Sequence, residues 1–335
     1  MSAITSNSES RARASEMLRT AMGCDIAAAL SDPAVVEIML NPDGRLWLDR
    51  LGHGRLDTGV SIEPAAAERI IRLVASSVRK EAHADNPIVS AELPARDGEA
   101  AGERFEGVLP PVVASPCFSI RKPASKIHTL AEYVADGVMT EPQAQALFRS
   151  IGERKNILVA GGTSSGKTTL ANALLAEIAS LNERVILIED TRELQCAAKD
   201  CVALRTKPGV VTLADLVRST LRLRPDRIIV GEVRGAEALD MLKAWNTGHP
   251  GGIATIHANS AESALSRVEQ LVQESVNSVP RRLIADAIDL VVFIEGRGTG
   301  RRVKSIKQIT GLTAGEYLLD DYVPSNIHAF HQRRQ

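Results

Sequence analysis

The sequence has few cysteines, and none of them are paired at metal-binding spacing. Only Cys24, Cys117, Cys196 and Cys201 occur among 335 residues, and no two form a CxxC pair. A structural zinc site or a disulfide framework is therefore not expected, and the thiols are predicted to be reduced. We expect Cys196 and Cys201 to be small, half-buried side chains.

The sequence also lacks long apolar runs and an excess of either charge. No apolar run approaches the roughly 18 residues that span a bilayer, and the N-terminus is polar rather than signal-like. We expect a protein that stays in the cytoplasm or docks on a membrane through others. With 40 Lys and Arg against 41 Asp and Glu, the net charge of −1 argues against coating of nucleic acid by bulk electrostatics.

Aromatic residues are scarce as well, with two Trp, three Tyr and five Phe. The rest of the composition, 44% hydrophobic and 24% charged, is typical of a soluble α/β protein. A length of 335 residues predicts two domains.

One stretch carries a specific chemical signal. Residues 157–160 form an apolar run of strand formers, and glycines break it before a segment with helical spacing. The turn contains G-x-x-x-x-G-K-T, filled by Gly161, Gly166, Lys167 and Thr168. Glycines let the backbone N–H groups face inward at a positive helix N-terminus, where they bind phosphate oxygens.

This phosphate-binding loop predicts ATP and Mg²⁺ as cofactors. Lys167 is expected to reach the β- and γ-phosphates, and Thr168 to offer its hydroxyl to Mg²⁺, which prefers a few oxygen ligands plus phosphate. The predicted nucleotide-binding residues are Gly161, Gly162, Thr163, Ser164, Ser165, Gly166, Lys167, Thr168 and Thr169.

Ahead of this loop the chain predicts a smaller α+β domain. Residues 1–15 are Ser-rich and low in apolar content, which predicts a disordered start. An amphipathic helix is expected from Glu16, then two strands joined by a turn at residues 41–44, and another helix over 64–80. We place the N-terminal domain at residues 16–122 and a linker at 123–140.

The second domain is predicted over residues 141–335, with strands and helices alternating as in a mostly parallel sheet covered on both faces. Its first helix is expected from Pro142 to Ile151. The predicted strands are 157–160, 185–189, 228–231, 253–257 and 290–294. Glu189, Asp190, Glu232 and His257 follow these strands, and ligands in such sheets sit beyond the strand C-termini.

Four ordered motifs resemble the boxes of the secretion ATPases of type II and type IV systems. GGTSSGKTT, IEDTREL, LRLRPDRIIVGEVRG and TGHPGGIATIHANS look like the Walker A loop, the acidic box, the Walker B strand and the His box. The resemblance covers residues from about 104 to 295 and is closest to the conjugative-transfer branch, the TrbB-like ATPases of plasmid mating systems.

This resemblance implies an N-terminal domain joined by a flexible linker to a RecA-like motor domain. It also implies a hexameric ring at the cytoplasmic face of the inner membrane, working with inner-membrane components of the apparatus. Lys167 and Thr168 would bind phosphate and Mg²⁺, Glu232 would be the Walker B glutamate, and His257 would close the His box.

The water-activating carboxylate has two candidates in this comparison. We favour Glu232 and keep Glu189, in the acidic box, as metal-linked or as the alternative base, so that Thr168, Glu189 and Glu232 are the metal candidates. The family also supplies arginines from the N-terminal domain to the nucleotide, and Arg104 and Arg121 look like them, either in cis or across subunits. The alternative is a pair of surface arginines that flank edge strands.

Two absences favour the type IV branch over pilus or type II assembly ATPases. The four-cysteine zinc module of type II and pilus-extension ATPases is missing, and so is the C-terminal signature of pilus-retraction ATPases. Residues 296–315 include five basic residues and no acidic residue. They predict either a contact with anionic lipid or a partner, or a solvated hairpin.

Two other classes of function are consistent with parts of the sequence. A DNA-translocating RecA-like helicase would use a basic segment made of Arg218, Arg222, Arg224 and Arg227. A nucleotide-gated scaffold would bind ATP without turnover, but such a protein has no need of Glu232.

Overall fold

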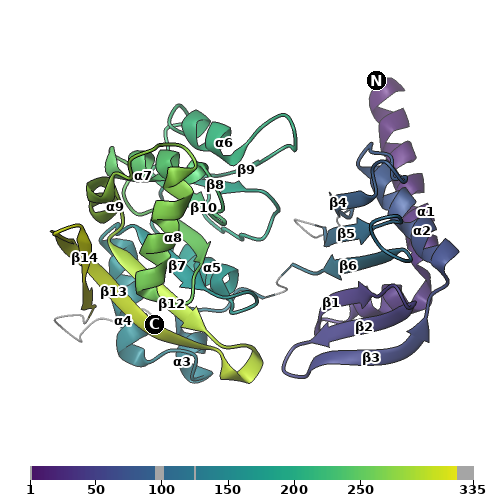
Figure 1. Ribbon diagram of the computed structural model, residues 1–335, viewed down its shortest axis with the longest axis horizontal. Helices are drawn as coiled ribbons and strands as arrows, with labels where there is room; N and C mark the ends of the chain where they lie inside the picture. Colours follow the sequence, from purple (N-terminus) through teal and green to yellow (C-terminus); the bar gives the residue numbers. More distant parts are fainter. Residues whose placement is uncertain (1, 95–101, 124–125, 323–335) are drawn as a thin grey trace. The chain divides into compact units, whose positions relative to one another are not determined.

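The computed structural model describes residues 2–94, 102–123 and 126–322, with side chains from residue 16 onward (Figure 1). The chain divides into two compact units, Met1–Ser125 and Lys126–Gln335. Each unit has its own sheet and its own hydrophobic core.

The N-terminal unit is a six-stranded antiparallel sheet in the order β3-β2-β1-β6-β5-β4, with two helices. The elements are α1 (Ser2–Ser31), β1 (Val35–Leu40), β2 (Arg45–Arg50), β3 (Gly54–Ser61), α2 (Pro64–Ser77), β4 (Ile88–Glu92), β5 (Arg104–Val108) and β6 (Cys117–Arg121). Both helices pack on one face of the sheet, where Ile38, Phe105 and Ile120 are buried. Side chains alternate between the faces of a strand, so Arg104 and Arg121 lie on the opposite face.

Helix α1 is longer than its amphipathic pattern predicts. It begins at Ser2 and therefore includes residues 2–15, for which we expected disorder. Those residues contain neither proline nor glycine, so nothing in their sequence interrupts a helix. Gly23, with φ 72°, kinks α1 within the predicted amphipathic part.

The C-terminal unit begins with two capped helices, α3 (Leu130–Ala135) and α4 (Glu141–Gly152). Thr129 and Thr140 each cap a helix, and the Glu or Gln three residues later bonds back to the cap. The segment that we assigned to a linker, 123–140, thus contains a helix whose Leu130 is fully buried in the core of the C-terminal unit. α3 has only six residues, too few for a recognisable helical period.

The sheet of this unit has eight strands in the order β14-β13-β12-β7-β11-β10-β8-β9. The six strands from β12 to β9 are parallel, and β13 and β14 extend one edge antiparallel. The mostly parallel sheet is confirmed. The strands are β7 (Ile157–Gly161), β8 (Val185–Glu189), β9 (Cys201–Arg205), β10 (Arg227–Val230), β11 (Ile253–His257), β12 (Leu290–Glu295), β13 (Arg302–Thr313) and β14 (Glu316–Asp321).

Helices cover both faces of this sheet, as Figure 1 shows. Alternate residues of β7 point to different cores: Ile157 and Val159 pack with α3, α4 and α5, whereas Leu158 and Ala160 join the core that holds α6 to α9. The remaining helices are α5 (Lys167–Ile178), α6 (Leu213–Thr220), α7 (Glu237–Asn246), α8 (Ala261–Gln273) and α9 (Arg281–Ala287). Central strands buried on both sides explain the continuous apolar runs in the sequence.

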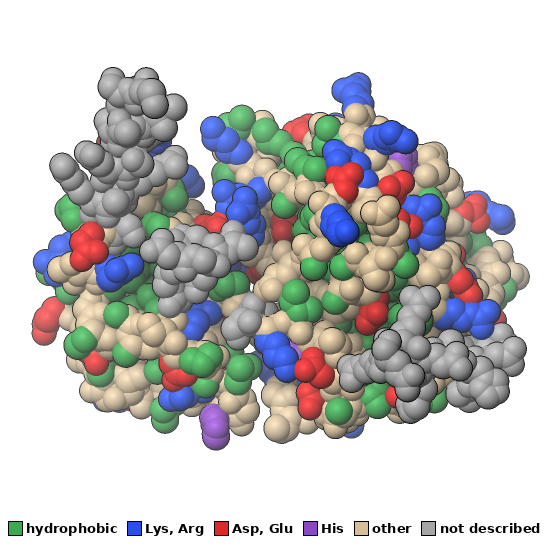
Figure 2. Space-filling model, turned by 180° about the vertical axis from the view of Figure 1, so that it is seen from behind, with side chains coloured by type: hydrophobic (Ala, Val, Ile, Leu, Met, Phe, Trp, Pro, Cys, Tyr) green, Lys and Arg blue, Asp and Glu red, His purple; other side chains and the backbone are tan. Residues whose placement is uncertain are grey.

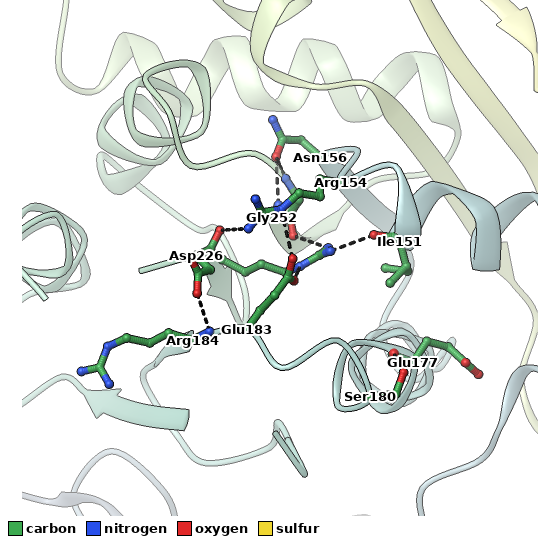
Figure 3. A network of polar contacts seen from close by, with 11 residues as sticks. Ile151, Arg154, Asn156, Glu177, Ser180, Glu183, Arg184, Asp226 and Gly252 are labelled. Carbon is green, nitrogen blue, oxygen red and sulfur yellow. Dashed lines mark hydrogen bonds and ion pairs between the residues drawn. The ribbon is translucent and has the colours of Figure 1, made fainter. Parts of the chain in front are cut away.

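At the N-terminal edge of the parallel strands, Asn156 fixes the start of β7 against its neighbours. Its Oδ1 accepts bonds from Gly251 N and Gly252 N at 2.9 Å, and its Nδ2 donates to Ala287 O at 2.8 Å. Figure 3 shows Asn156 beside Gly252 in this network. These bonds therefore fix the start of β7 beside the start of β11 and help to set the register of the two strands.

A buried arginine lies at the same end of the parallel strands. Arg227, at the start of β10, is fully buried, and its guanidinium pairs with Glu183 and donates to Ile151 O at 2.8 Å and to Gly251 O at 3.3 Å. Arg154 reaches the same carboxylate at 3.2 Å (Figure 3). A buried charge held by several partners is costly to leave unpaired.

Arg227→Ala should therefore destabilise the C-terminal unit by about 3 kcal/mol, because two buried carbonyls lose their donor and Glu183 keeps only one of its two arginines. Trp245 fluorescence in a Trp47→Phe background, followed during urea unfolding, reports on this unit. The matched control is Arg222→Ala, which removes an exposed guanidinium five residues earlier. Equal urea midpoints for the two variants would show that the Arg227 network adds no stability.

Candidate nucleotide-binding site

The phosphate-binding loop joins the C-terminal end of β7 to the N-terminus of α5. Gly166 is the N-cap with φ 95°, a left-handed conformation that favours glycine. Gly161 cannot carry a side chain, because a Cβ there would lie 2.4 Å from Ile294 O and 2.6 Å from Ser165 Oγ. The loop thus presents backbone N–H groups at the positive end of α5, as anion binding requires.

Lys167 lies within this loop, with only 7% of its surface exposed. Its Nζ donates to Gly162 O at 2.9 Å and lies 3.4 Å from His257 Nδ1. His257 is the last residue of β11, and the strand register pairs it with Gly161. The strand alignment therefore brings the His-box residue to the phosphate-binding loop.

Glu232 continues this series at the end of the next strand, β10. His257 Nε2 lies 2.8 Å from Glu232 Oε1, and Arg234 pairs with the other carboxylate oxygen. Burial lowers the pKa of His257, and the Lys167 ammonium lowers it further. Lys167 follows β7, His257 ends β11 and Glu232 follows β10. These three side chains thus form a series of contacts in the order of the three strands in the sheet.

Glu189, at the end of β8, is only 3% exposed and lies one strand further along. Its Oε1 accepts bonds from Glu193 N at 2.9 Å and Leu194 N at 2.8 Å. Burial raises the pKa of Glu189 to about 7, against the effect of these two amides. A Cβ on Gly231 would lie 3.0 Å from Glu189 Cγ, so this carboxylate packs closely against the strand that carries Glu232.

Glu193 is a site residue that the sequence interpretation did not select. Thr168 Oγ1 donates to Glu193 Oε2 at 3.2 Å, and Asn172 Nδ2 donates to Glu193 O at 3.1 Å. The available signal was its place in IEDTREL, where it is the second glutamate of the acidic box.

The described residues include no cluster of three or more His, Cys, Asp or Glu side chains able to hold a metal unaided. The pairing of the Thr168 hydroxyl with the Glu193 carboxylate nevertheless fits Mg²⁺, which takes few protein oxygens and completes its shell with water and phosphate. Of the other two predicted metal ligands, Glu189 ends β8 and Glu232 follows β10, the strand next to β8.

The basic segment 296–315 fits the predicted solvated hairpin, because most of it is β13, which pairs antiparallel with β14 and exposes Arg302 and Lys304. A contact with anionic lipid or a partner stays a prediction. Arg302 and Lys304 pair with Glu295, and Lys307 pairs with Asp321, so two acids outside the segment offset part of its positive charge. Arg301 packs on the phosphate-binding loop, where a Cβ on Gly166 would lie 2.8 Å from its Nε. Through Arg301 the segment is therefore part of the wall of the candidate nucleotide site.

Arg104 and Arg121 lie in the N-terminal unit, whereas the other predicted site residues lie in the C-terminal unit. They are direct cross-strand neighbours on β5 and β6. Glu92 stands opposite Arg104, and Glu37 stands opposite Arg121. β5 and β6 are inner strands of their sheet, so neither arginine lies on an edge strand, although β5 pairs with the edge strand β4.

Two polar residues of the motif boxes lie apart from the Lys167–His257–Glu232 series. His249 precedes β11, and its Nδ1 lies 3.3 Å from Ala244 O, at the opposite end of the strand from His257. Asp190 follows Glu189 but accepts a bond from Thr206 Oγ1 at 2.9 Å. Both have local structural partners.

Comparisons with known proteins agree with this geometry. The type II/IV secretion system protein family matches residues 64–295. The chain is 51% identical to the conjugal transfer protein TrbB of Rhizobium radiobacter over 91% of this chain and 93% of the relative. It is 36% identical to the type IV secretion system protein PtlH of Bordetella pertussis, over 85% and 93%.

Among solved structures, the pilus retraction motor PilT with bound ADP has the same fold. Its TM-score is 0.59 at 19% identity, over 90% of this chain and 83% of that one. The segment that matches the family model is more than half of the chain and includes the phosphate-binding loop, Glu189, Glu232 and His257. The chain belongs to the type II/IV secretion system protein family.

Proposed function

We propose that this protein is the ATP-hydrolysing motor of a type IV secretion or conjugative-transfer system. The observation that carries the proposal is the contact series from Lys167 through His257 to Glu232, beside a phosphate-binding loop. The transfer process is inferred from the names of the relatives, which include a conjugal transfer protein and a type IV secretion protein.

The reaction is transfer of the γ-phosphoryl group of ATP to water. The loop amides and Lys167 bind the phosphates and offset the charge that develops on them. Thr168 and the Glu193 carboxylate beside it would hold Mg²⁺, which would supply positive charge to the phosphate oxygens. His257 lies between the Lys167 ammonium and Glu232. Its Nε2 is 2.8 Å from Glu232 Oε1, and this contact keeps the carboxylate in position.

The contacts of the two candidate bases favour Glu232. Glu189 uses one oxygen for two backbone amides, which fixes the segment after β8. The Glu232 carboxylate is instead held by side chains, those of His257 and Arg234. We therefore assign water activation to Glu232 and a positioning role to Glu189.

The assembly is proposed from family resemblance. We propose a homo-oligomer, a hexameric ring, peripheral on the cytoplasmic face of the inner membrane and bound to membrane components of the transfer apparatus. Among the described residues, no helix has the length and apolarity to cross a bilayer.

The helicase alternative has less support from the side chains that motivated it. Arg227 is fully buried, and Arg218 pairs with Asp240 at 2.8 Å. Only Arg222 and Arg224 of that segment are exposed without an acidic partner among the described residues. Two arginines do not make a strip that tracks a nucleic-acid backbone.

Substitutions in the contact series should separate binding from chemistry. Lys167→Ala should lower ATP turnover by about 10²-fold or more, because it removes charge stabilisation of the transferring phosphoryl group. Glu232→Gln should keep ATP affinity but lose turnover, since an amide cannot accept the proton. Phosphate release and equilibrium binding of a fluorescent ATP analogue measure the two effects.

Lys243→Ala, on the exposed face of α7, is the matched lysine control and should be unchanged. Turnover of Lys167→Ala within a few-fold of the parent would contradict the site assignment. Loss of nucleotide affinity in Glu232→Gln would instead make Glu232 a metal-site residue and Glu189 the base.

The raised pKa of Glu189 predicts a pH-dependent stability. A carboxyl whose pKa rises from 4.5 to about 7 on folding stabilises the protein below pH 4.5 and loses that contribution as pH rises through 7. Against Glu189→Gln, whose amide oxygen still accepts both backbone bonds, the parent should lose about 3 kcal/mol of unfolding free energy across that window. Urea unfolding at a series of pH values measures this, and parallel pH profiles would contradict it.

Arg104 and Arg121 are proposed to reach the nucleotide phosphates in the assembled protein. Replacing either by alanine should lower turnover, while lysine should restore it only partly, because an ammonium lacks the guanidinium fork. Fluorescence transfer between the two units should also show an ATP-dependent distance in the parent and a smaller response in the variants.

Arg69→Ala, an exposed arginine of α2, is the control for loss of one positive charge in this unit. Mixing Arg104→Ala with Lys167→Ala protein tests the direction of the contact, since turnover recovers only if the arginine acts across subunits. Unchanged turnover and distance response in both alanine variants would remove these arginines from the site.

A further inference from the structure

The connection from β8 to β9, residues 190–200, joins two parallel strands without a helix. It runs beside α5: Gln195 N donates to Asn172 Oδ1 at 2.9 Å, and Asn172 Nδ2 donates to Glu193 O at 3.1 Å. Glu193 in turn accepts the bond from Thr168 Oγ1. The position of this segment is thus linked to the phosphate-binding loop through a few hydrogen bonds.

This segment also brings two cysteines together. Cys196 lies within it, and Cys201 is the first residue of β9, opposite Val185 of β8. Both side chains are half-buried and pack against the same hydrophobic core, five residues apart in the sequence, and each thiol shifts the pKa of the other. The other two cysteines, Cys24 and Cys117, lie in the N-terminal unit.

The chemistry of the pair suits thiol–disulfide exchange. The neighbouring Cys201 thiol lowers the pKa of Cys196 to about 7, although burial opposes this, whereas Cys196 raises the pKa of Cys201. Cys196 therefore supplies the nucleophilic thiolate near neutral pH. Hydrogen bonds to Glu189 and Asn172 hold residues 193–195, which lie just ahead of Cys196 in the β8–β9 connection.

We propose that Cys196 and Cys201 form a reversible dithiol–disulfide site that controls the segment bearing Glu193. The oxidant is a small-molecule disulfide such as oxidised glutathione. The Cys196 thiolate attacks one of its sulfurs, and one glutathione thiolate leaves. The Cys201 thiol then loses its proton and attacks Cys196 Sγ, which releases the second glutathione. The protein loses two protons and two electrons, and the oxidant gains them.

The consequence follows from the hydrogen bonds of the segment. A disulfide draws the two sulfurs much closer than two separate thiols can approach, so Cys196 must shift toward β9. Gln195 is its direct neighbour, and the shift weakens the bond from Gln195 N to Asn172 Oδ1. Asn172 also orients Glu193, so the oxidised protein should hydrolyse ATP more slowly; this last step rests on the proposed function.

The test uses the full-length Cys24→Ser/Cys117→Ser protein, in which only the proposed pair can react. After incubation with oxidised glutathione and alkylation, peptide mass mapping should find a 196–201 disulfide that dithiothreitol reverses. Hydrogen exchange at residues 193–195 should become faster on oxidation. Turnover should fall several-fold and recover on reduction, and adding Cys201→Ser should abolish both responses.

Glutathione adducts without a 196–201 disulfide, or no reaction, would overturn the proposal. A disulfide that changes neither hydrogen exchange nor turnover would overturn its control of the segment. If the reduced protein hydrolyses no ATP, the proposed function fails, while the peptide map and hydrogen exchange still decide the redox site.

Discussion

The register between β7 and β11 is the constraint on which the candidate site depends. Asn156 bonds the chain before β11 at the start of the two strands, and five residues later Gly161 and His257 end them side by side. A shift of one residue would turn His257 to the other face of the sheet and away from Lys167. The distances from His257 to Lys167, 3.4 Å, and to Glu232, 2.8 Å, therefore depend in part on contacts at the opposite ends of these strands.

The two ends of the parallel strands use polar residues differently. At the N-terminal ends of the strands, Arg227 pairs with Glu183 and bonds nearby backbone groups, so these charges hold the strands together. At the C-terminal edge, Lys167, His257 and Glu232 contact one another through side chains beside a loop of N–H donors. Such groups can exchange partners when phosphate and metal bind, as a hydrolytic site requires.

The sequence predicted most of what positions this site. Continuous apolar strands and the G-x-x-x-x-G-K-T turn have strong local signals, and strand ends must converge in a parallel sheet. The structure differs where contacts between distant segments decide the outcome. Three basic side chains of the acid-free run 296–315 pair with Glu295 and Asp321, and Arg301 packs on the phosphate-binding loop, which no local pattern indicates. Figure 2 shows the wider pattern, with acidic and basic side chains interspersed over the face it presents. Short elements such as α3 and the edge strand β9 lack a readable period.

The central claim is that the C-terminal ends of β7, β11 and β10 form one ATP site. A structure of the protein with Mg²⁺ and a non-hydrolysable ATP analogue tests it most directly. The account predicts the γ-phosphate within hydrogen-bonding distance of Lys167 Nζ, about 3 Å, with a water between it and Glu232. A γ-phosphate bound elsewhere, or one whose attacking water contacts Glu189 and not Glu232, would contradict the account.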